Sequence, residues 1–446
     1  MGNKKELDNF TKRDTVAIND KNHLEIDGVD TIELTEKYGT PLMVYATKTI
    51  RQNIDALKEG LSAYKGKTEI SYASKAFSSA ALYQVINQED IAIDVVSGGE
   101  LYIAKQAGFP AEKINFHGNN KSLEELTAAL DYSIGIIIVD NFHELEVLTE
   151  LTNERKQETT ILMRITPGVS ANTHRHIMTG QADSKFGFDL QSGQAEEALN
   201  LALKAPYLNV KGLHMHIGSQ ITDTQSYEVS MNQILGYINT WREELDFEFT
   251  IFNIGGGFGI QHTTEEVDNS PKNQLNIISN KLMELLDDHN IPYPELWIEP
   301  GRSIVGPAGI TLYEVGSQKD LPGIRHYVSI NGGMTDNIRP SLYDAKYTGF
   351  IANRMNEEAN ETVSIAGKAC ESGDMLISDL ALPKVESGDI LAVINTGAYS
   401  FAMASNYNRI PRPAVVFVEA GKDFLAIKRE TPEDFMRFEN LLPEND

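Results

Sequence analysis

Lys75 stands where a short apolar segment ends, within residues 71–77 (SYASKAF). The segment before it, Thr68 to Ser74, is typical of a buried strand, and a helical pattern follows directly. Two interpretations fit this position. The side chain could carry its ammonium past the strand end into solvent, or a desolvated amine could form a Schiff base with a carbonyl cofactor. Lys75 alone does not decide between them.

Chemically versatile residues occur at the ends of several other apolar segments. They are Asp94 to Glu100 at the second segment, His117 to Asn120 at the third, Arg164 at the fifth, His214 to Ser219 at the sixth, Gly255 to Gly259 at the seventh and Glu299 to Arg302 at the eighth. If the segments are the parallel strands of a barrel, their carboxyl ends meet at one rim, where such barrels carry their active sites. We therefore expect these residues to form one site.

The glycine run 255–259 (GGGFG) lacks the spacing of the two common nucleotide-binding motifs. The last glycine of a dinucleotide fingerprint would fall at Ile260, and no Gly-Lys-Ser/Thr follows. What remains is a loop whose backbone N–H groups can approach an anion, after strand seven, where barrels bind phosphate. With Ser219 and Arg302 in neighbouring loops, the run indicates a phosphate monoester, and a purely structural loop is the alternative.

Two histidines, His214 and His216, lie two residues apart at the end of a predicted strand. The sequence has no cysteine cluster and no His-Glu-x-x-His helix, so no metal site is expected. His216, nearer the strand end, is better placed to stack on a flat cofactor ring. For His214, a hydrogen-bonded core histidine is an equally good interpretation.

A lysine, a phosphate loop, a stacking histidine and a carboxylate, Glu299, together describe a site for pyridoxal phosphate. An acid beside the pyridine nitrogen keeps that nitrogen protonated, and the protonated ring is a strong electron sink for a carbanion at Cα. Glu299 therefore favours decarboxylation over proton transfer alone.

The elements that would position these residues alternate between strand-like and helix-like patterns. The apolar runs are Ile70–Ala73, Ile91–Val96, Ile114–Phe116, Ile134–Val139, Ile161–Ile165, Val210–Ile217, Phe249–Ile254 and Leu296–Ile298. Helical patterns separate most of them, and Ser122-x-x-Glu125 is a capping box. Apolar strands that alternate with helices predict a parallel sheet. Eight repeats predict an α/β fold with a (β/α)8 TIM-like barrel, and a doubly wound open sheet is the alternative.

The flanking parts of the chain have shorter, alternating apolar runs separated by Gly, Pro and Asp turns. They predict a mostly antiparallel β domain, a sandwich or a barrel. The runs include His326–Ile330, Val363–Ala366, Ile390–Ile394 and Ala414–Glu419. The N-terminal leader, read as short strands and turns ending in a strand at Leu42–Ala46, is expected to join this domain. The predicted domains are 47–309 for the barrel, opening with a helix from 47 to about 64, and 1–46 with 310–446 for the β domain.

Composition narrows the partners of this 446-residue chain. Its formal net charge of −25 argues against nucleic acid. The longest apolar run, Ile134–Val139, is too short to span a membrane. The single cysteine, Cys370, and a polar N-terminal segment without a signal-peptide pattern predict a cytoplasmic protein.

In their order along the chain, these motifs resemble the diaminopimelate decarboxylases, a family of the alanine racemase-like (fold type III) pyridoxal phosphate enzymes. The resemblance runs from about residue 39 to residue 413. The matching stretches are 72–76 (YASKA), 117–122 (HGNNKS), 183–187 (DSKFG), 212–220 (GLHMHIGSQ), 253–257 (NIGGG), 299–302 (EPGR), 370–374 (CESGD) and 397–399 (GAY).

The resemblance implies pyridoxal 5'-phosphate as cofactor and an obligate homodimer whose active sites are shared between subunits. Lys75 would form the Schiff base, His216 would stack on the ring, and Cys370 would donate a proton into the site of the other subunit. Cofactor contacts would come from Ser219, Gly256, Gly257, Glu299, Pro300, Gly301, Arg302 and Tyr399, with Asp94 and Glu100 as supporting acids. A lone cysteine is more often a small buried side chain, but the turn of glycine and acidic residues around Cys370 opposes that alternative.

The substrate is suggested by residues in the C-terminal part. A diamine-producing relative such as ornithine decarboxylase neutralises only a distal ammonium, whereas diaminopimelate carries a second amino-acid centre and needs a bidentate partner for its carboxylate. By resemblance, the substrate residues are Arg302, Arg339, Tyr343, Glu371 and Tyr399. The prediction is decarboxylation of meso-2,6-diaminopimelate to L-lysine and CO2, the final step of lysine biosynthesis. The alternatives are a decarboxylase of ornithine, arginine or lysine, and an inactive cofactor-binding homologue.

Overall fold

The computed structural model describes residues 2–168, 184–264, 266 and 270–443, and it divides the chain into two compact units. The barrel unit comprises Arg51–Gln261 and Val267–Ile304. The β unit comprises Met1–Ile50, His262–Glu266 and Val305–Asp446. Helix α3 (Thr47–Leu61) leads along the chain from the β unit into the barrel unit.

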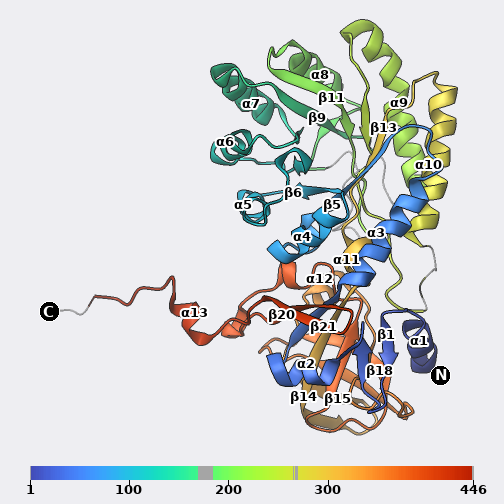
Figure 1. The fold of residues 1–446 in the computed structure, drawn as a ribbon, viewed down its shortest axis with the longest axis vertical. Helices are drawn as coiled ribbons and strands as arrows, with labels where there is room; N and C mark the ends of the chain where they lie inside the picture. Colours follow the sequence, from blue (N-terminus) through green and yellow to red (C-terminus); the bar gives the residue numbers. More distant parts are fainter. Residues whose placement is uncertain (1, 169–183, 265, 267–269, 444–446) are drawn as a thin grey trace. The chain divides into compact units, whose positions relative to one another are not determined.

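Eight parallel strands of the barrel unit form a closed sheet. In the order in which they pair, they are β5 (Thr68–Ala73), β6 (Ala92–Val95), β7 (Ile114–Phe116), β8 (Ile136–Val139), β9 (Thr159–Thr166), β11 (Leu208–His214), β12 (Ile251–Asn253) and β13 (Glu295–Ile298). Figure 1 labels β5, β6, β9, β11 and β13 among them. The circle closes where β13 pairs with β5, with Ile298 opposite Ile70. A short strand, β10 (Phe188–Asp189), adds to β9. The barrel prediction is confirmed, and the open-sheet alternative is wrong because an open sheet has no such closing pair.

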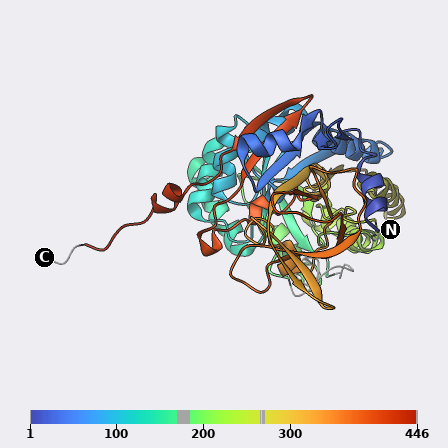
Figure 2. The ribbon, with the colours of Figure 1, turned by 90° about the horizontal axis from the view of Figure 1, so that it is seen from below.

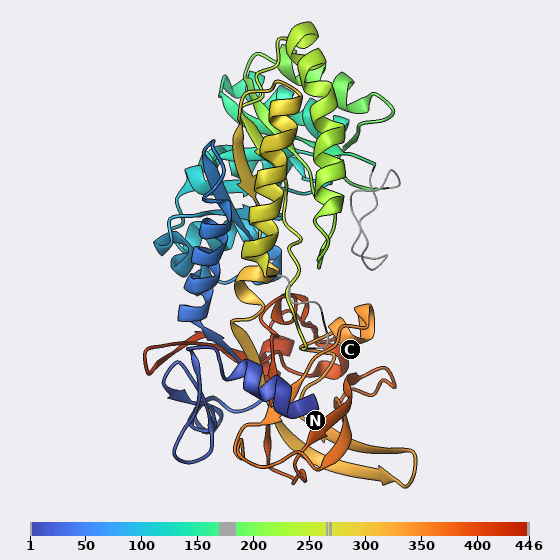
Figure 3. The ribbon, with the colours of Figure 1, turned by 90° about the vertical axis from the view of Figure 1, so that its right-hand side faces the viewer.

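The helices of the barrel unit lie on the outside of the sheet, and Figure 3 shows α9 and α10 side by side there. They are α4 (Ala80–Gln88), α5 (Gly98–Gln106), α6 (Leu123–Tyr132), α7 (Phe142–Arg155), α8 (Gln194–Lys204), α9 (Gln225–Leu245), α10 (Pro271–Asp288) and the single turn α11 (Arg302–Val305). Helix α6 begins at the predicted capping box of Ser122 and Glu125. Helix α10 buries Leu275, Ile278 and Leu282, which share one face at helical spacing.

Apolar side chains fill the interior of the barrel. Ile136 and Ile138 of β8, Leu162 of β9 and Ile251 of β12 form one cluster, against which Trp297 of β13 packs. Because β9 and β12 are not neighbours in the sheet, their side chains meet inside the barrel. This core holds the strands in register and so fixes the residues at their ends.

One strand is shorter than the sequence predicts, and the difference affects the site. The apolar run Val210–Ile217 was expected to be one strand, but β11 ends at His214. Its neighbour β12 ends at Asn253, and Gly255 follows with a positive φ of 73°. The Met215 N–H still donates to the Asn253 carbonyl at 2.9 Å, but the pairing with β12 stops there, so His216 lies in a loop.

The β unit contains a nine-stranded, mostly antiparallel sheet, as predicted. Its strands are β4 (Leu42–Ala46), β14 (Gly309–Leu321), β15 (Arg325–Ile330), β16 (Gly349–Ile351), β17 (Glu361–Ala366), β18 (Met375–Leu382), β19 (Ile390–Ile394), β20 (Ala414–Glu419) and β21 (Lys422–Ile427). Strand β4 lies between β14 and β20 (Figure 2), so the leader does join the C-terminal strands. Helix α12 (Arg339–Tyr343) lies in the connection between β15 and β16, and α13 (Pro432–Met436) follows the last strand, β21.

The leader also contains two helices that its polar pattern did not predict, α1 (Gly2–Phe10) and α2 (Thr31–Tyr38). Between them, β1 (Val16–Ile18), β2 (Leu24–Ile26) and β3 (Val29–Asp30) form a small antiparallel sheet. Helix α2 begins at Asp30, whose Oδ1 accepts from the Ile32 N–H at 2.8 Å. Among the described residues, no helix is both long and apolar enough to cross a lipid bilayer.

Candidate active site

The barrel brings the predicted residues of its strand ends to one rim. Asp94 lies within β6 and Arg164 within β9, and Glu299 directly follows β13. Lys75 lies in a turn of 3-10 helix (Ser74–Ala76) after β5. His117 follows β7 and continues its ladder, since its N–H donates to the Val95 carbonyl at 2.8 Å. The expectation that these residues share one end of the barrel is confirmed.

Lys75 is solvent-exposed, and within the part of the chain that the structure describes it makes no hydrogen bond or ion pair. The turn that carries it is fixed by the loop after β13. The Ala73 N–H donates to the Pro300 carbonyl at 3.1 Å. A Cβ at Gly301 would lie 2.9 Å from the Cβ of Ala76. A close approach that only glycine allows therefore joins the loop of strand eight to the turn that presents the amine.

The carboxylate of Glu299 is buried and contacts three side chains from other strand ends. Its Oε1 lies 3.0 Å from His117 Nε2 and accepts from Asn253 Nδ2 at 2.6 Å. Its Oε2 lies 3.1 Å from His214 Nε2. His214 is thus a buried, hydrogen-bonded histidine, which is one of the two interpretations its sequence position allowed. A carboxylate oxygen of Glu299 and one ring nitrogen of each histidine lie within 4.8 Å of one another, so their spacing would also allow them to bind a cation.

Asp94 extends this network. It lies 3.7 Å from His117 Nε2 through Oδ1, which also accepts from the Ser71 hydroxyl. Asn115 on β7 donates to Ser71 Oγ at 2.9 Å. Burial and the nearby Glu299 carboxylate raise the pKa of Asp94 to about 6. Glu100, on α5, is half-buried and accepts from the Val96 N–H at 2.7 Å, and burial raises its pKa.

The charges around Glu299 are unevenly distributed. Burial opposes ionisation of Glu299, but His117 and His214 hold its pKa well below the usual value. Burial also opposes the charge of His117, yet the Glu299 and Asp94 carboxylates raise the pKa of His117 to about 9. Burial lowers the pKa of His214 to about 4. Around neutral pH the network therefore contains a Glu299 carboxylate, a His117 imidazolium and a neutral His214.

His216 and the glycine loop contact each other directly. The ring of His216 accepts from the Gly256 N–H at 3.2 Å through Nδ1. Burial lowers the pKa of His216 well below its usual value, and the nearby charge of Lys75 lowers it further, so the ring is neutral. Gly257 has a positive φ of 101°, and a Cβ there would lie 2.2 Å from the Gly218 carbonyl oxygen. The two loops therefore pack backbone against backbone.

Arg302 and Ser219 meet at the same rim, where Arg302 Nη2 donates to Ser219 Oγ at 3.1 Å. Arg302 is 5% exposed and opens α11 directly after Gly301. Arg164 is also buried, and its Nη1 lies 3.4 Å from Asp140 Oδ1.

The remaining predicted residues belong to the β unit. The Arg339 guanidinium lies 5.1 Å from the ring centre of Tyr343 and 5.6 Å from that of Tyr399, so the structure brings these three together. Cys370 is exposed, and its N–H donates to Asn408 Oδ1 at 2.7 Å. The alternative of a buried cysteine is therefore wrong. Glu371, next to it, is also exposed.

Sequence reasoning missed several residues that support this rim. Asn253 lies in the motif 253–257 with no role assigned from the sequence, yet it donates directly to Glu299. Ser71 and Asn115 are polar residues within buried strands, a signal that was visible in the sequence. Of the motif 183–187, Asp183 lies outside the described residues.

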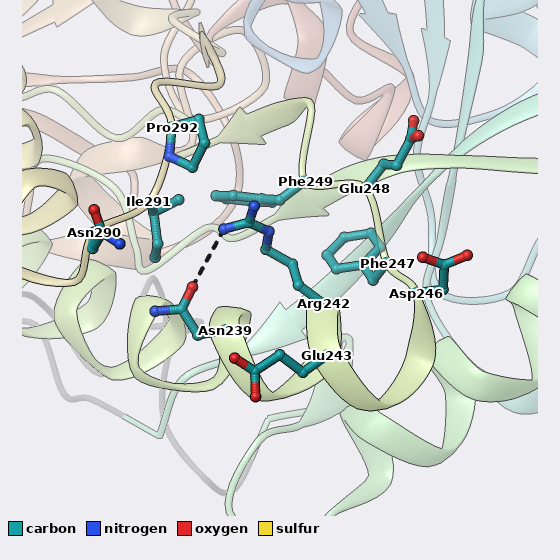
Figure 4. A pocket seen from close by; sticks show the side chains of 10 residues that line it. All are labelled: Asn239, Arg242, Glu243, Asp246, Phe247, Glu248, Phe249, Asn290, Ile291 and Pro292. Atoms are coloured by element: carbon teal, nitrogen blue, oxygen red, sulfur yellow. Dashed lines mark hydrogen bonds between the residues drawn. The ribbon is translucent and has the colours of Figure 1, made fainter.

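A separate pocket of about 560 Å³ lies where the chain enters β12, at the opposite end of that strand from Gly255 (Figure 4). It contains none of the predicted site residues. Its lining comprises Asn239, Arg242, Glu243, Asp246, Phe247, Glu248, Phe249, Asn290, Ile291 and Pro292. Within it, Arg242 donates to Asn239 Oδ1 at 3.4 Å.

Known proteins share this sequence and fold. The family model described as "Pyridoxal-dependent decarboxylase, pyridoxal binding domain" matches residues 47–306. The diaminopimelate decarboxylase of Bacillus methanolicus is 54% identical over 417 residues, which cover 93% of this chain and 96% of that protein. That of Bacillus subtilis (strain 168) is 52% identical over 421 residues, which cover 94% and 96%. The crystal structure of diaminopimelate decarboxylase from M. jannaschii in co-complex with L-lysine matches with a TM-score of 0.89 at 37% identity, covering 96% of this chain and 98% of that chain.

The fold and the family model together define a pyridoxal phosphate-dependent decarboxylase of the barrel type. Within that class, the chain belongs to the diaminopimelate decarboxylase family.

Proposed function

We propose that this enzyme decarboxylates meso-2,6-diaminopimelate to L-lysine and CO2. The observation that carries the proposal is the ionised, buried Glu299 carboxylate at the same barrel rim as the exposed amine of Lys75. The relatives named diaminopimelate decarboxylase, and the co-complex of one of them with L-lysine, support the substrate and the product.

The residues at the rim fit pyridoxal 5'-phosphate by the chemistry of their donor groups. Lys75 offers an amine for the carbonyl group. Arg302 and Ser219 offer a guanidinium and a hydroxyl for the phosphate, as does the backbone of Gly256 and Gly257. Contacts from Pro300, Gly301 and Tyr399 would complete the set. When bound, the cofactor accepts the electron pair of the Cα–carboxylate bond into its ring.

The roles of the other side chains at the rim follow from their charge. Glu299, held ionised, would keep a proton on the ring nitrogen. His216, held neutral, would pack on the ring face without repelling it. Asp94, beside His117, would balance the charge of that network.

The β-unit residues would act on the substrate. Arg339 would bind the distal carboxylate through its planar fork, oriented by the rings of Tyr343 and Tyr399. Glu371 would bind the distal ammonium, and Arg302 would also reach the substrate. The exposed thiol of Cys370 would donate a proton to Cα. A diamine-forming enzyme has no use for a guanidinium at the distal end, which favours diaminopimelate over ornithine, arginine or lysine.

We also propose a homodimer in which Cys370 serves the site of the other subunit, and a division into domains at 47–309 and at 1–46 with 310–446. The exposure of Cys370 supports the first, and the two compact units support the second. The formal charge of −25 and the single cysteine support a cytoplasmic enzyme without nucleic-acid partners.

The replacement Glu299→Ala tests the role of the carboxylate. The variant should bind pyridoxal phosphate but lose most turnover, because the ring nitrogen loses the anion that keeps it protonated. Cofactor content is measured by absorbance and turnover by CO2 release from meso-diaminopimelate. Unchanged turnover would show that the electron-sink argument is wrong.

Mixing two inactive variants tests the shared site. Lys75→Ala and Cys370→Ala are each expected to be inactive. If Cys370 acts across the dimer, subunits of the two variants unfolded and reassembled together should regain about a quarter of wild-type activity, because half the dimers are mixed and each has one complete site. No recovery, in mixed dimers verified by mass spectrometry, would place Lys75 and Cys370 of one site on one chain.

A further inference from the structure

The surroundings of Glu299 define what its carboxylate can still do. Its two oxygens have about four lone-pair sites; His214 and Asn253 donate to two of them, and His117 Nε2 lies 3.0 Å from Oε1 as an ion-pair partner. Oε2 has a single side-chain donor, so the carboxylate can accept one further hydrogen bond. All three partners are at most 6% exposed, and Glu299 is 9% exposed. Its orientation is thus fixed from three strands, β7, β11 and β12.

Of the three partners, His117 alone lies between two carboxylates, 3.0 Å from Glu299 Oε1 and 3.7 Å from Asp94 Oδ1. Burying two ionised carboxylates side by side without a cation greatly destabilises the folded protein, so one of them would take up a proton. A charged imidazole between them removes that cost. His117 is buried and contacts Glu299 and Asp94, so it would act on the site through Glu299.

We propose that His117 is a positioning residue whose buried positive charge keeps Glu299 ionised and in one orientation, so that this carboxylate can hold a proton on the cofactor's ring nitrogen. The inference rests on the role of Glu299 given under the proposed function. The new element is that His117, which is not among the proposed cofactor contacts, controls the charge of Glu299 and so the protonation of the ring nitrogen.

Other charged and titratable groups face Glu299 from every strand packed against it, and none replaces His117. His214 on β11 is neutral, and its Nδ1 has no hydrogen-bond partner among the described residues. Arg164 on β9 also stabilises the Glu299 charge, but its guanidinium lies beside Asp140. His216 is neutral and in contact with Gly256. Asp94 on β6 is an acid and opposes the ionisation of Glu299.

The charge of His117 gives a pH dependence that packing alone would not give. Its pKa in the folded protein, about 9, lies above the ordinary 6.5. Its contribution to stability is therefore complete below pH 6.5 and is lost as the pH rises through about 9.

The first experiment measures thermal unfolding of the full chain from pH 6 to 10, before and after loading with pyridoxal phosphate. His117→Gln keeps a hydrogen-bond donor but removes the charge, and His117→Phe removes both. His143→Gln, on the exposed side of α7, is the matched control. At pH 6 both His117 variants should have a melting temperature well below that of the wild type. This difference in melting temperature should become smaller as the pH approaches 10. The proposal is overturned if the difference in melting temperature is the same at every pH, or if His117→Gln melts at the same temperature as the wild type.

The second experiment follows the absorption spectrum of the loaded enzyme against pH. The wild-type spectrum should be constant from pH 6.5 to 8.5. In His117→Gln it should change within this interval, as Glu299 gains a proton and releases the ring nitrogen. Loading both proteins with 1-deazapyridoxal phosphate, which has no ring nitrogen, should remove the difference. A spectrum unaffected by His117→Gln overturns the link to the cofactor.

A third measurement covers the case in which neither variant folds. In wild-type enzyme with 13Cε1-labelled histidine, one resonance among the ten histidines should titrate near pH 9. A set of histidines that all titrate below pH 7.5 overturns the proposal. Failure of the proposed function is recognised separately, because it would appear as full turnover in Glu299→Ala while the unfolding and NMR results stand unchanged.

Discussion

The ion pair of Lys121 and Glu144 is the most deeply buried charge pair of the barrel unit among the described residues, and it provides a sharp stability prediction. The side chains are 1% and 2% exposed, and Lys121 Nζ lies 2.7 Å from Glu144 Oε1. Nζ also donates to the carbonyls of Gly118 at 2.9 Å and Ile138 at 2.8 Å. Glu144 Oε2 accepts from the Asp140 N–H at 3.0 Å. All three protons of the ammonium are thus used.

Lys121→Met removes the cation and leaves Glu144 buried without compensation. Breaking a buried pair in this way costs about 3–5 kcal/mol. Burial already raises the pKa of Glu144 with Lys121 present, so its carboxylate should take up a proton in the variant. The double variant Lys121→Met, Glu144→Leu should recover part of the loss, because neither charge of this pair remains.

Equilibrium urea unfolding of the full chain measures these free energies. Lys113→Met is the matched control, since Lys113 pairs with Asp90 at the surface, where the side chains are 31% and 89% exposed. That change should cost less than about 1 kcal/mol. Equal costs for Lys121→Met and Lys113→Met, or a double variant less stable than Lys121→Met, would refute the reasoning. Lys121 also follows His117 in the same loop, so Lys121→Met should lower turnover.

Three further predictions concern single residues. Gly257→Ala should reduce the affinity for pyridoxal phosphate at least tenfold in equilibrium dialysis, because the new Cβ would lie 2.2 Å from the Gly218 carbonyl oxygen. Gly388→Ala is the control: Gly388 also has a positive φ, but no atom lies within 4 Å of the new Cβ, so the affinity should not change. Arg339→Lys should raise the KM for meso-diaminopimelate about tenfold or more, because an ammonium cannot bind a carboxylate through two parallel bonds. Cofactor content should not change. An unaltered KM would show that Arg339 does not bind the substrate. Burial raises the pKa of Asp336 to about 7, above its unfolded value, so wild-type stability should fall as the pH rises from about 4 to 7. In thermal unfolding, Asp336→Asn should not show this loss of stability between about pH 4 and 7. Asp320→Asn, a change at an exposed position, should still show it.

The barrel could be predicted because its signals are local. Each strand is a short apolar run, and the helix signals, such as the Ser122 and Glu125 capping box, lie within a few residues. Helix α2 was missed because its apolar positions are sparse, although Asp30 at its start and Glu33 in its first turn were visible signals. The early end of β11 at His214 could not be seen, because it depends on where the neighbouring β12 turns away.

The site was predictable as a group of strand ends but not as a network. Rim residues such as Lys75 and Glu299 follow their apolar runs directly, so the topology alone brings them together. The partners of Glu299 are different, because Asn253 lies 46 residues before it and His214 lies 85 residues before it. Which polar residue contacts which carboxylate depends on side-chain directions around the closed barrel, and sequence spacing contains no such information. The charge state of His117 follows from those contacts and was equally invisible.

Release of CO2 from meso-diaminopimelate by the purified enzyme loaded with pyridoxal phosphate tests the central claim most directly, with ornithine, arginine and lysine assayed beside it. We expect stoichiometric CO2 and L-lysine from meso-diaminopimelate, a rate at least a hundredfold lower for each of the other three amino acids, and no release by Lys75→Ala. Faster decarboxylation of ornithine, arginine or lysine than of meso-diaminopimelate, or equal activity of Lys75→Ala, would contradict it.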